Sequence, residues 1–331
     1  MKKIKIINQN IDNRYIDLFY YLYKKEENIN YFMSDIKLSI DYCLSKKDIV
    51  TITLSDNEML LGHCSIIKSK ENNNSTAYFG FFESLKNELD FKLIWEKIII
   101  EAKKQNIKKL VGPINGSIWF PYRFLNTSDE SSLFKGELPT SMSYHKYLSN
   151  LENKRIIKYS SGARKNFDLI IEDTKQSYKL FQNTDLKIES LSEISEKTLK
   201  EIYKLAGEIF SNKSIAYEHF PVNYFLELYN KDKMKDLFRM YIVRNGDKLV
   251  GFCSAFYEKE KVIILKTLAI APLFQKKGIG SALAHLLHSE AKESGINKII
   301  YALVRDDNDI KFFPKDDVIN IRIYSLFEIN I

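Results

Sequence analysis

An internal repeat with a fixed spacing of 189 residues, from Gly62 to Gly251, constrains the fold of this 331-residue chain more than any other feature. Residues 60–65 read LLGHCS, and residues 249–254 read LVGFCS. The same spacing relates EAKKQNIKKLV, which starts at Glu101, to EAKESGINKII, which starts at Glu290. Independent matches at one spacing are the signature of a duplicated structural unit. We therefore predict a tandem duplication of one α/β domain.

The pattern of apolar residues predicts matching elements in the two copies. For the second copy we expect helices at 195–210, 222–229 and 281–294, and strands at about 186–190, 239–244, 248–257, 261–270, 297–304 and 320–329. For the first copy we expect a helix near 91–105 and strands near 49–54, 59–68, 76–83 and 107–112. A polar stretch at 172–177 predicts a linker, so we place the domains at residues 1–175 and 176–331.

The segment from Gln275 to Gly280, which reads QKKGIG, lies between the apolar strand 262–270 and the amphipathic helix 281–294. Two glycines allow backbone N–H groups to approach a phosphate closely, and the N-terminus of the following helix adds the positive end of its dipole. A dinucleotide-binding fingerprint would need a third glycine and an acidic residue about 20 positions later. The segment predicts a pyrophosphate site, with a tight packing turn as the alternative.

Gln-x-x-Gly-x-Gly between a strand and a helix resembles the acyl-coenzyme A loop of the GNAT superfamily of N-acetyltransferases. Residues 265–274, LKTLAIAPLF, look like the strand that leads into that loop. The resemblance implies an α/β (α+β) chain with two tandem GNAT-like domains, each a mixed, mostly antiparallel twisted sheet flanked by helices. It also implies direct attack of an amine on an acyl thioester. Acetyl-coenzyme A would be the co-substrate, and a small-molecule or peptide amine would be the acceptor.

The same resemblance implies which residues hold the cofactor. In the family, the strand before the loop splays from its neighbour, and free amides near Leu268, Ala269 and Ile270 would hold the thioester carbonyl and the pantetheine arm. The loop and the first helical turn would hold the pyrophosphate, with Gln275, Lys276, Lys277, Gly278, Ile279, Gly280 and Ser281 as the contact residues. Asn308 matches a further asparagine of the family pattern. Because the backbone makes these contacts, we expect the glycines to matter more than the lysines.

The first copy differs at this loop. At the repeat spacing, residues 86–91, which read KNELDF, fall opposite QKKGIG. Leu89 and Phe91 replace the two glycines, and Glu88 and Asp90 add negative charge. Side chains at the glycine positions block close backbone approach, and carboxylates repel a pyrophosphate. We predict that the first copy has lost the cofactor and supports the second copy or shapes its substrate site.

A general base is not evident from the sequence. Relatives often carry a basic glutamate on the strand before the loop, but residues 262–270 contain no carboxylate. Glu258 and Glu260 lie in the preceding hairpin, and Glu218 and His219 lie in a loop on the substrate side. Each of these four side chains is also typical of a solvated surface.

The acid that would protonate the departing thiolate is equally unclear. Many relatives carry a tyrosine about seven residues after the matching asparagine, where this chain has Lys315. Phe312 and Phe313 cannot replace its hydroxyl group. Tyr324 on the final strand is the remaining candidate acid, and proton transfer through water is the alternative.

Charge and composition indicate which partners and which cellular location to expect. The net charge of +7 comes from lysines that are scattered along the chain among acidic residues, so we expect no nucleic-acid partner. No run of 18 apolar residues is present, and the start of the chain resembles a short strand rather than a signal peptide. We therefore predict a cytoplasmic protein without a membrane segment. The sequence does not indicate whether the chain is a monomer or an oligomer.

Cysteine and histidine spacing predicts no metal site. Cys43, Cys64 and Cys253 lack the spacing of metal ligands, and we expect them to be small core residues. His285 and His288 share one polar stripe of the helix 281–294, so we expect both to face solvent. The aromatic run 119–122 follows two breakers and predicts either a pocket or core packing.

Three classes of function remain. The favoured one is a coenzyme A-dependent N-acyltransferase with an active second domain. The second is an aminoacyl-transferase of the Fem type, which also has two GNAT-like domains but uses charged transfer RNA; the intact glycine loop argues against it. The third is a non-catalytic acyl-coenzyme A sensor, which the missing acid and base leave open.

Overall fold

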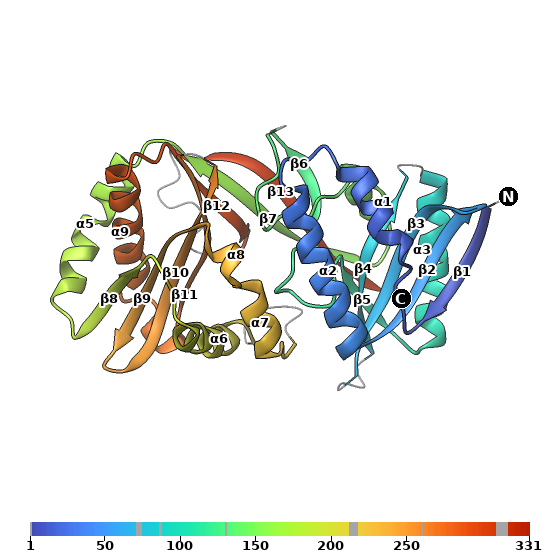
Figure 1. Cartoon of the computed structure of the whole chain (residues 1–331), viewed down its shortest axis with the longest axis horizontal. Coiled ribbons are helices and arrows are strands. Elements are labelled where there is room, and N and C mark those ends of the chain that lie inside the picture. The colour runs from blue at the N-terminus through green and yellow to red at the C-terminus, as the bar shows by residue number, and fades with distance from the viewer. Residues whose placement is uncertain are drawn as a thin grey trace. The chain divides into compact units, whose positions relative to one another are not determined.

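The computed structural model describes residues 2–70, 75–85, 88–129, 131–211, 218–259, 261–308 and 317–331. The chain divides into two units (Figure 1). Unit 1 consists of Met1–Tyr159 together with Arg322–Ile331, and unit 2 consists of Ser160–Ile321. Strands β7 (Lys154–Arg164) and β13 (Ile319–Asn330) each run from one unit into the other.

Unit 1 is built on a mostly antiparallel sheet in the order β1-β2-β3-β4-β5-β13, with β6 paired to β13. β4 and β5 run parallel, whereas β2 is antiparallel to both of its neighbours. The elements of unit 1 are β1 (Lys2–Asn8), α1 (Arg14–Tyr23), α2 (Ile29–Lys46), β2 (Lys47–Asp56), β3 (Met59–Ser69), β4 (Thr76–Ser84), α3 (Glu88–Lys104), β5 (Lys109–Gly112), β6 (Phe124–Ser128) and α4 (Met142–Ser149).

Unit 2 repeats this plan with the sheet order β8-β9-β10-β11-β12-β7. Its parallel pair is β11 and β12, and β10 is antiparallel to both β9 and β11. The elements of unit 2 are α5 (Asp168–Gln182), β8 (Leu186–Leu191), α6 (Glu196–Ser211), α7 (Val222–Leu228), α8 (Lys231–Met234), β9 (Leu237–Asn245), β10 (Lys248–Lys259), β11 (Val262–Ile270), the 3-10 turn η1 (Pro272–Phe274), α9 (Ile279–Glu293) and β12 (Lys298–Arg305).

The same hairpin occurs at the matching place in both units. β2 and β3 are joined by Asn57 and Glu58, and β9 and β10 are joined by Gly246 and Asp247. The tight two-residue turn needs a positive φ, which Asn57 (+52°) supplies in unit 1 and Gly246 (+56°) supplies in unit 2. Asparagine and glycine are the residues that adopt this conformation most readily. The repeat in the sequence is therefore a repeat of structure.

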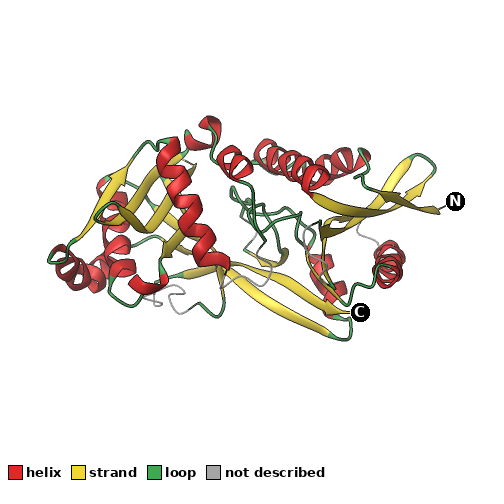
Figure 2. Ribbon diagram, turned by 90° about the horizontal axis from the view of Figure 1, so that it is seen from below, coloured by secondary structure: helices red, strands yellow, loops and turns green. Residues whose placement is uncertain are grey.

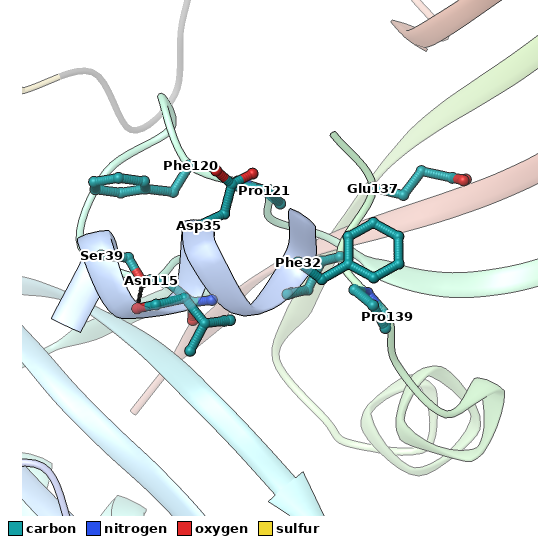
Figure 3. A pocket seen from close by; sticks show the side chains of 10 residues that line it. Phe32, Asp35, Ser39, Asn115, Phe120, Pro121, Glu137 and Pro139 are labelled. Atoms are coloured by element: carbon teal, nitrogen blue, oxygen red, sulfur yellow. Dashed lines mark hydrogen bonds between the residues drawn. The ribbon is translucent and has the colours of Figure 1, made fainter. Parts of the chain in front are cut away.

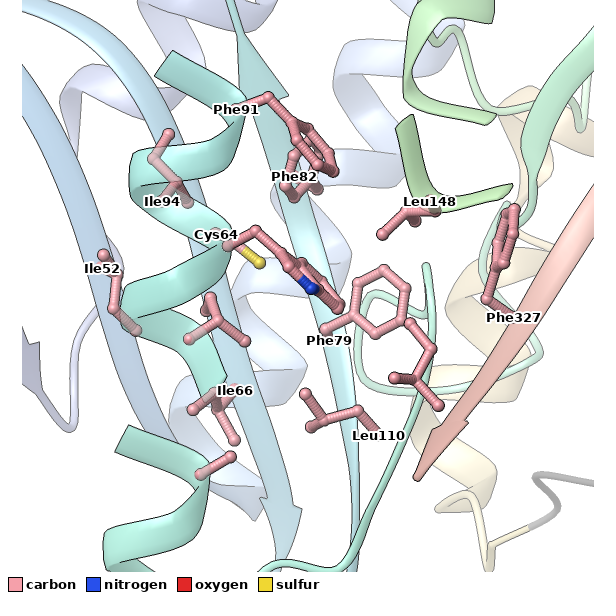
Figure 4. Close-up of a cluster of buried hydrophobic side chains, with 14 of the residues drawn as sticks. Ile52, Cys64, Ile66, Phe79, Phe82, Phe91, Ile94, Leu110, Leu148 and Phe327 are labelled. Carbon is pink, nitrogen blue, oxygen red and sulfur yellow. The ribbon is translucent and has the colours of Figure 1, made fainter. Parts of the chain in front are cut away.

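Helices lie on both faces of the unit 1 sheet (Figure 2). The face covered by α3 is apolar, and its buried side chains interdigitate between strands and helix (Figure 4). This core includes Ile52, Ile66, Phe79, Ile94 and Phe327. The opposite face, under α1, buries polar groups as well as aromatic rings. There Thr51 and Ser65 share a hydrogen bond of 2.8 Å. The three cysteines are buried, as expected.

The last strand of the chain belongs to unit 1. From Arg322 onward β13 pairs with β6 and β5, whose residues precede position 130. The predicted strand at 320–329 therefore exists, but its second part completes the sheet of the N-terminal unit rather than that of the C-terminal one. The stretch 172–177, predicted as a linker, lies inside helix α5. The boundaries between the two units fall at residue 160 and again at residue 322.

Candidate functional site

The loop 275–278 leads from η1 into the N-terminus of α9. Gly278 caps the helix with a left-handed φ of +76°, and Lys276 also has a positive φ of +59°. The first intrahelical bond runs from Ala282 N to Gly278 O (2.9 Å), so the amides of residues 279–281 have no acceptor within the helix. Unpaired amides and the positive end of the helix dipole together favour an anion at this position.

β11 and β12 separate halfway along their length. They pair in parallel over four residue pairs, of which the last is Leu265–Tyr301, and both strands are described throughout. β11 continues to Ile270 while its other edge stays paired with β10. Lys266 is the extra residue of a β-bulge in the β10 pairing. A bulge bends its strand, and this one coincides with the point where the two parallel strands diverge.

The alternation along β11 identifies the amides that face the diverging side. Ala271 N donates to Val250 O (2.8 Å), so this amide points toward β10. Successive amides of a strand point to opposite edges, so those of Ile270 and Leu268 point toward the side of β12. Gln275 Nε2 donates to Ile270 O (2.8 Å) and ties the loop to the same edge. Unit 2 thus places these strand amides and the loop amides in succession along one stretch of chain.

The remaining predicted residues of unit 2 belong to neither β11 nor the loop, or fall outside the described part of the chain. Asn308 is exposed, and its backbone amide donates to Arg305 O (3.0 Å). Glu258 lies half-buried at the end of β10, and His219 is exposed. Four further residues named in the sequence analysis lie outside the described part of the chain: Glu260, Phe312, Phe313 and Lys315.

Tyr324, the candidate acid, lies in the part of β13 that belongs to unit 1, whereas the loop belongs to unit 2. Only 3% of the residue is exposed, and its hydroxyl donates to the Glu137 carboxylate. Glu137 also accepts from Phe134 N (2.6 Å) and lies 3.5 Å from Arg322 Nη1. The sequence missed this buried partner because 187 residues separate Tyr324 from Glu137.

The corresponding strand edge of unit 1 is covered by the chain itself. β4 and β5 pair in parallel up to Tyr78–Val111, and the segment after β5 then stays on β4. Phe81 N donates to Asn115 Oδ1 (2.7 Å). A Cβ added to Gly80 would lie 2.3 Å from a backbone oxygen of this segment, so the two backbones are in direct contact.

A second side chain caps β4 farther along. Ser84 N donates to Tyr144 Oη (2.9 Å), and this hydroxyl in turn donates to Ser84 O (2.8 Å) or to the Glu83 carboxylate (2.9 Å). Burial beside Glu83 raises the pKa of Tyr144 well above its usual value, so the hydroxyl stays protonated. β4 ends at Ser84 and α3 is described from Glu88, so at most three residues separate them, against eight in unit 2.

Unit 1 also contains a small pocket between α2 and the segments after β5 and before α4 (Figure 3). Phe120 and Pro121 of the aromatic run line it, and Phe120 is buried in the core as well. Two carboxylates, those of Asp35 and Glu137, also line this pocket. Phe120 therefore packs in the core and borders a pocket, which are the two roles predicted for this run.

The expectation that the helix histidines face solvent is wrong for His288, which is 1% exposed. α5 was not predicted, and it packs on α9 with Tyr178 stacked on His285 at a centroid distance of 4.8 Å. His288 Nε2 lies 2.6 Å from Tyr301 Oη, which accepts a hydrogen bond from Arg164 (2.9 Å). Apolar residues at Ile170 and Phe181, three helical turns apart, were the signal for this helix.

Burial lowers the pKa of two histidines to about 4, His63 in unit 1 and His288 in unit 2, from the usual value of 6.5. Below pH 6.5 each histidine is protonated in the unfolded chain but stays neutral in the folded chain. The free energy of unfolding therefore falls as the pH drops from 6.5 toward 4. Each site can remove up to about 3 kcal/mol over that window. His63 Nδ1 donates to Phe81 O (2.7 Å), which places the proton of the neutral ring on Nδ1.

We predict that His63→Phe flattens this pH dependence. The repeat places Phe252 at the matching position of unit 2, so the substitution suits this fold. Between pH 7 and pH 5, denaturant unfolding should show wild-type stability falling by about 2 kcal/mol more than that of the variant. His219→Phe, at an exposed histidine, is the control. An unchanged slope in His63→Phe would contradict the assignment.

Comparisons with known proteins agree with this architecture. Residues 199–315 match the family described as Acetyltransferase (GNAT) family, and no curated protein matches the chain significantly. A solved tandem GNAT protein from the clavulanic acid biosynthesis pathway superposes with a TM-score of 0.57 at 8% identity, covering 99% of this chain and 98% of that one.

Two further solved structures have the same fold. A conserved protein from Enterococcus faecalis, described as a probable N-acyltransferase, has a TM-score of 0.58 at 11% identity over 99% of this chain and 72% of that one. A GCN5-related N-acetyltransferase from Anabaena variabilis has a TM-score of 0.57 at 10% identity over 98% of this chain and 72% of that one.

The predicted GNAT domain and tandem two-domain fold are therefore confirmed. Each unit has a mixed, mostly antiparallel sheet flanked by helices, as expected. Within the part of the chain that the structure describes, no helix is both long and apolar enough to cross a lipid bilayer.

Proposed function

We propose that this chain, which carries a GNAT acetyltransferase domain at residues 199–315, transfers an acyl group from acyl-coenzyme A to an amine. Acetyl-coenzyme A is the expected donor, unit 2 binds it, and a small-molecule or peptide amine accepts the acyl group. The observation that supports this best is the succession of amide donors from the diverging edge of β11, through the loop, to the first turn of α9.

The residues present fit a coenzyme A molecule. A Cβ added to Gly278 would meet only the Ser177 Cβ, at 3.8 Å, so the loop backbone is open to close approach. The amides from Lys276 to Ser281 would hold the pyrophosphate, and those of Leu268 and Ile270 would hold the thioester carbonyl and the pantetheine arm. Lys276 and Lys277 are exposed and add positive charge near the phosphates.

The thioester supplies an electrophilic carbonyl carbon and a thiolate leaving group. The N–C bond forms while the C–S bond breaks, and the proton that the amine loses balances the charge of the thiolate. An alkylammonium with a pKa of about 10.4 is about one part in a thousand neutral at pH 7, which adds about 4 kcal/mol to the barrier. Strand β11 has no carboxylate to remove this proton. We therefore assign the transfer to water and give Tyr324 no role, because Glu137 holds its buried hydroxyl.

Titration calorimetry with coenzyme A tests the proposal through its stoichiometry. We expect one molecule per chain, because Asn115 and Tyr144 occupy the strand edge in unit 1 that the pantetheine arm would need. Release of free thiol from acetyl-coenzyme A in the presence of an amine panel is the catalytic readout. Two bound molecules per chain would contradict the loss of the unit 1 site, and no binding would contradict the proposal as a whole.

A non-catalytic acyl-coenzyme A sensor is the second candidate, and the absence of a carboxylate on β11 favours it. The same two measurements separate the candidates. A sensor binds coenzyme A with one site per chain but releases no thiol with any amine, whereas the transferase does both.

A further inference from the structure

Strand β7 holds β12 from the side opposite to β11. The sheet order of unit 2 places β12 between β11 and β7, and the end of β7 that belongs to unit 2 carries Ser161 and Arg164. Both of these side chains are fully buried. Arg164 Nη1 donates to Tyr301 Oη (2.9 Å). Ser161 Oγ accepts a hydrogen bond from Leu303 N (3.0 Å). β7 therefore contacts β12 at Tyr301, the last residue that pairs with β11, and again two residues later.

Leu303 departs from strand geometry. Its φ is +54°, in the left-handed region, which a residue with a Cβ adopts only at a cost in free energy. Because a regular strand needs a negative φ at every residue, the ladder with β11 cannot continue in a regular way through this position. The bulge at Lys266 in β11 and the left-handed residue in β12 thus lie on the two sides of one divergence.

The repeat provides an internal comparison. At the spacing of 189 residues, Ile114 of unit 1 matches Leu303 of unit 2. Ile114 N donates to Phe79 O (2.8 Å) on β4, so the chain after β5 stays on its neighbour and covers that strand edge. Leu303 N donates to Ser161 Oγ instead, on the far side of β12 from β11. The matching amides therefore bond toward the covered edge in unit 1 and away from the open edge in unit 2.

We propose that Ser161 is a positioning residue that keeps β11 and β12 apart for acyl-coenzyme A. Its oxygen atom holds Leu303 in the left-handed conformation, and this turn keeps the end of β12 off β11. The β11 amides of Leu268 and Ile270 then stay available for the thioester carbonyl and the pantetheine arm. This inference rests on the function proposed above, and it gives a role to a buried side chain that touches no part of the cofactor.

Loss of the Ser161 hydroxyl should weaken binding of the pantetheine arm and spare that of the nucleotide. In Ser161→Ala the Leu303 amide loses its acceptor, so an arrangement in which β12 pairs further along β11 gains population. Only chains with separated strands accept the arm, and the apparent affinity falls with their fraction. We expect the KM for acetyl-coenzyme A to rise about 10-fold, with kcat changed less than about 3-fold. The Kd for 3′-phospho-ADP, the nucleotide half of coenzyme A, should change less than about 3-fold.

Three further variants of the full-length chain test whether the effect passes through Leu303. Ser161→Thr keeps the hydroxyl group and should keep the wild-type KM. Leu303→Gly, added to Ser161→Ala, should restore that KM, because glycine adopts the left-handed conformation without strain. Ser160→Ala is the matched control. It removes a buried hydroxyl group from the same strand, but this group bonds to the Asp306 side chain (3.0 Å) rather than to the backbone of β12. The KM should therefore stay at its wild-type value.

Amide hydrogen exchange adds a readout that needs no cofactor. The Leu303 amide should exchange faster in Ser161→Ala than in wild type, because its hydrogen bond is lost. An unchanged KM in Ser161→Ala, an equal loss of 3′-phospho-ADP binding, or no restoration by Leu303→Gly would each overturn the inference. If wild type itself bound no coenzyme A, the proposed function would fail, and this inference would fail with it.

Discussion

Gly280→Asp is expected to abolish coenzyme A binding while the protein stays folded. Gly280 is the second residue of α9, and its amide is one of the three that lack an acceptor within the helix. A carboxylate in the first turn of a helix is favourable for the helix itself, by about 0.3–1 kcal/mol. The same charge about 4 Å from a pyrophosphate is unfavourable by about 4 kcal/mol near a protein surface, which is roughly 1,000-fold in affinity.

Two controls separate this effect from damage to the fold. Lys277→Ala should weaken binding less than 10-fold, because backbone amides make the proposed phosphate contacts and its ammonium group is exposed to solvent. Gly295→Ala changes a glycine with a positive φ (+70°) at the other end of α9, where an added Cβ meets nothing within 4 Å. It should lower stability by about 1 kcal/mol and leave binding intact. Equal losses in Gly280→Asp and Lys277→Ala would show that the loop is not the phosphate site.

Features that depend on local backbone chemistry could be predicted from the sequence. A two-residue hairpin turn needs a residue with a positive φ, and Asn57 and Gly246 indicate this turn in the two copies. In the same way, Gly278 indicates the left-handed cap at the start of α9. The repeat then predicted one fold for both halves, because the same pattern of turns and apolar positions must bury the same faces.

Features that depend on distant partners could not be predicted in this way. Periodicity showed a strand at 320–329, but nothing local to it specifies that Phe327 pairs with Gly112 in the first unit. The outer face of α5 is polar, so the stretch 172–177 looked like a linker although Ile170 and Phe181 are buried. The cofactor site of unit 1 is a further example. Leu89 and Phe91 replace the loop glycines and predicted that unit 1 lacks the loop, but they do not predict what covers its strand edge. The side chains that cap the exposed strand edge come from more than 30 residues away.

Removal of residues 322–331 is expected to unfold unit 1. These ten residues supply four buried apolar side chains, those of Tyr324, Leu326, Phe327 and Ile329, and the strand that pairs with β5 and β6. At about 2 kcal/mol for each buried side chain the loss is about 8 kcal/mol, which is comparable to the whole stability of a typical domain. Calorimetry of the truncated chain should show that the unfolding transition of unit 1 is lost.

Unit 2 ends at Ile321, so the truncated chain should still bind one molecule of coenzyme A. Single substitutions in β13 provide a graded version of the same test. Phe327→Ala should destabilise unit 1 by about 3–5 kcal/mol, because it removes a fully buried ring. Ile319→Ala, in the same strand but 63% exposed, should have an effect below about 0.5 kcal/mol. If the truncated chain kept the unit 1 transition, β13 would not be part of that fold. If it lost cofactor binding as well, the folding of unit 2 would depend on that of unit 1.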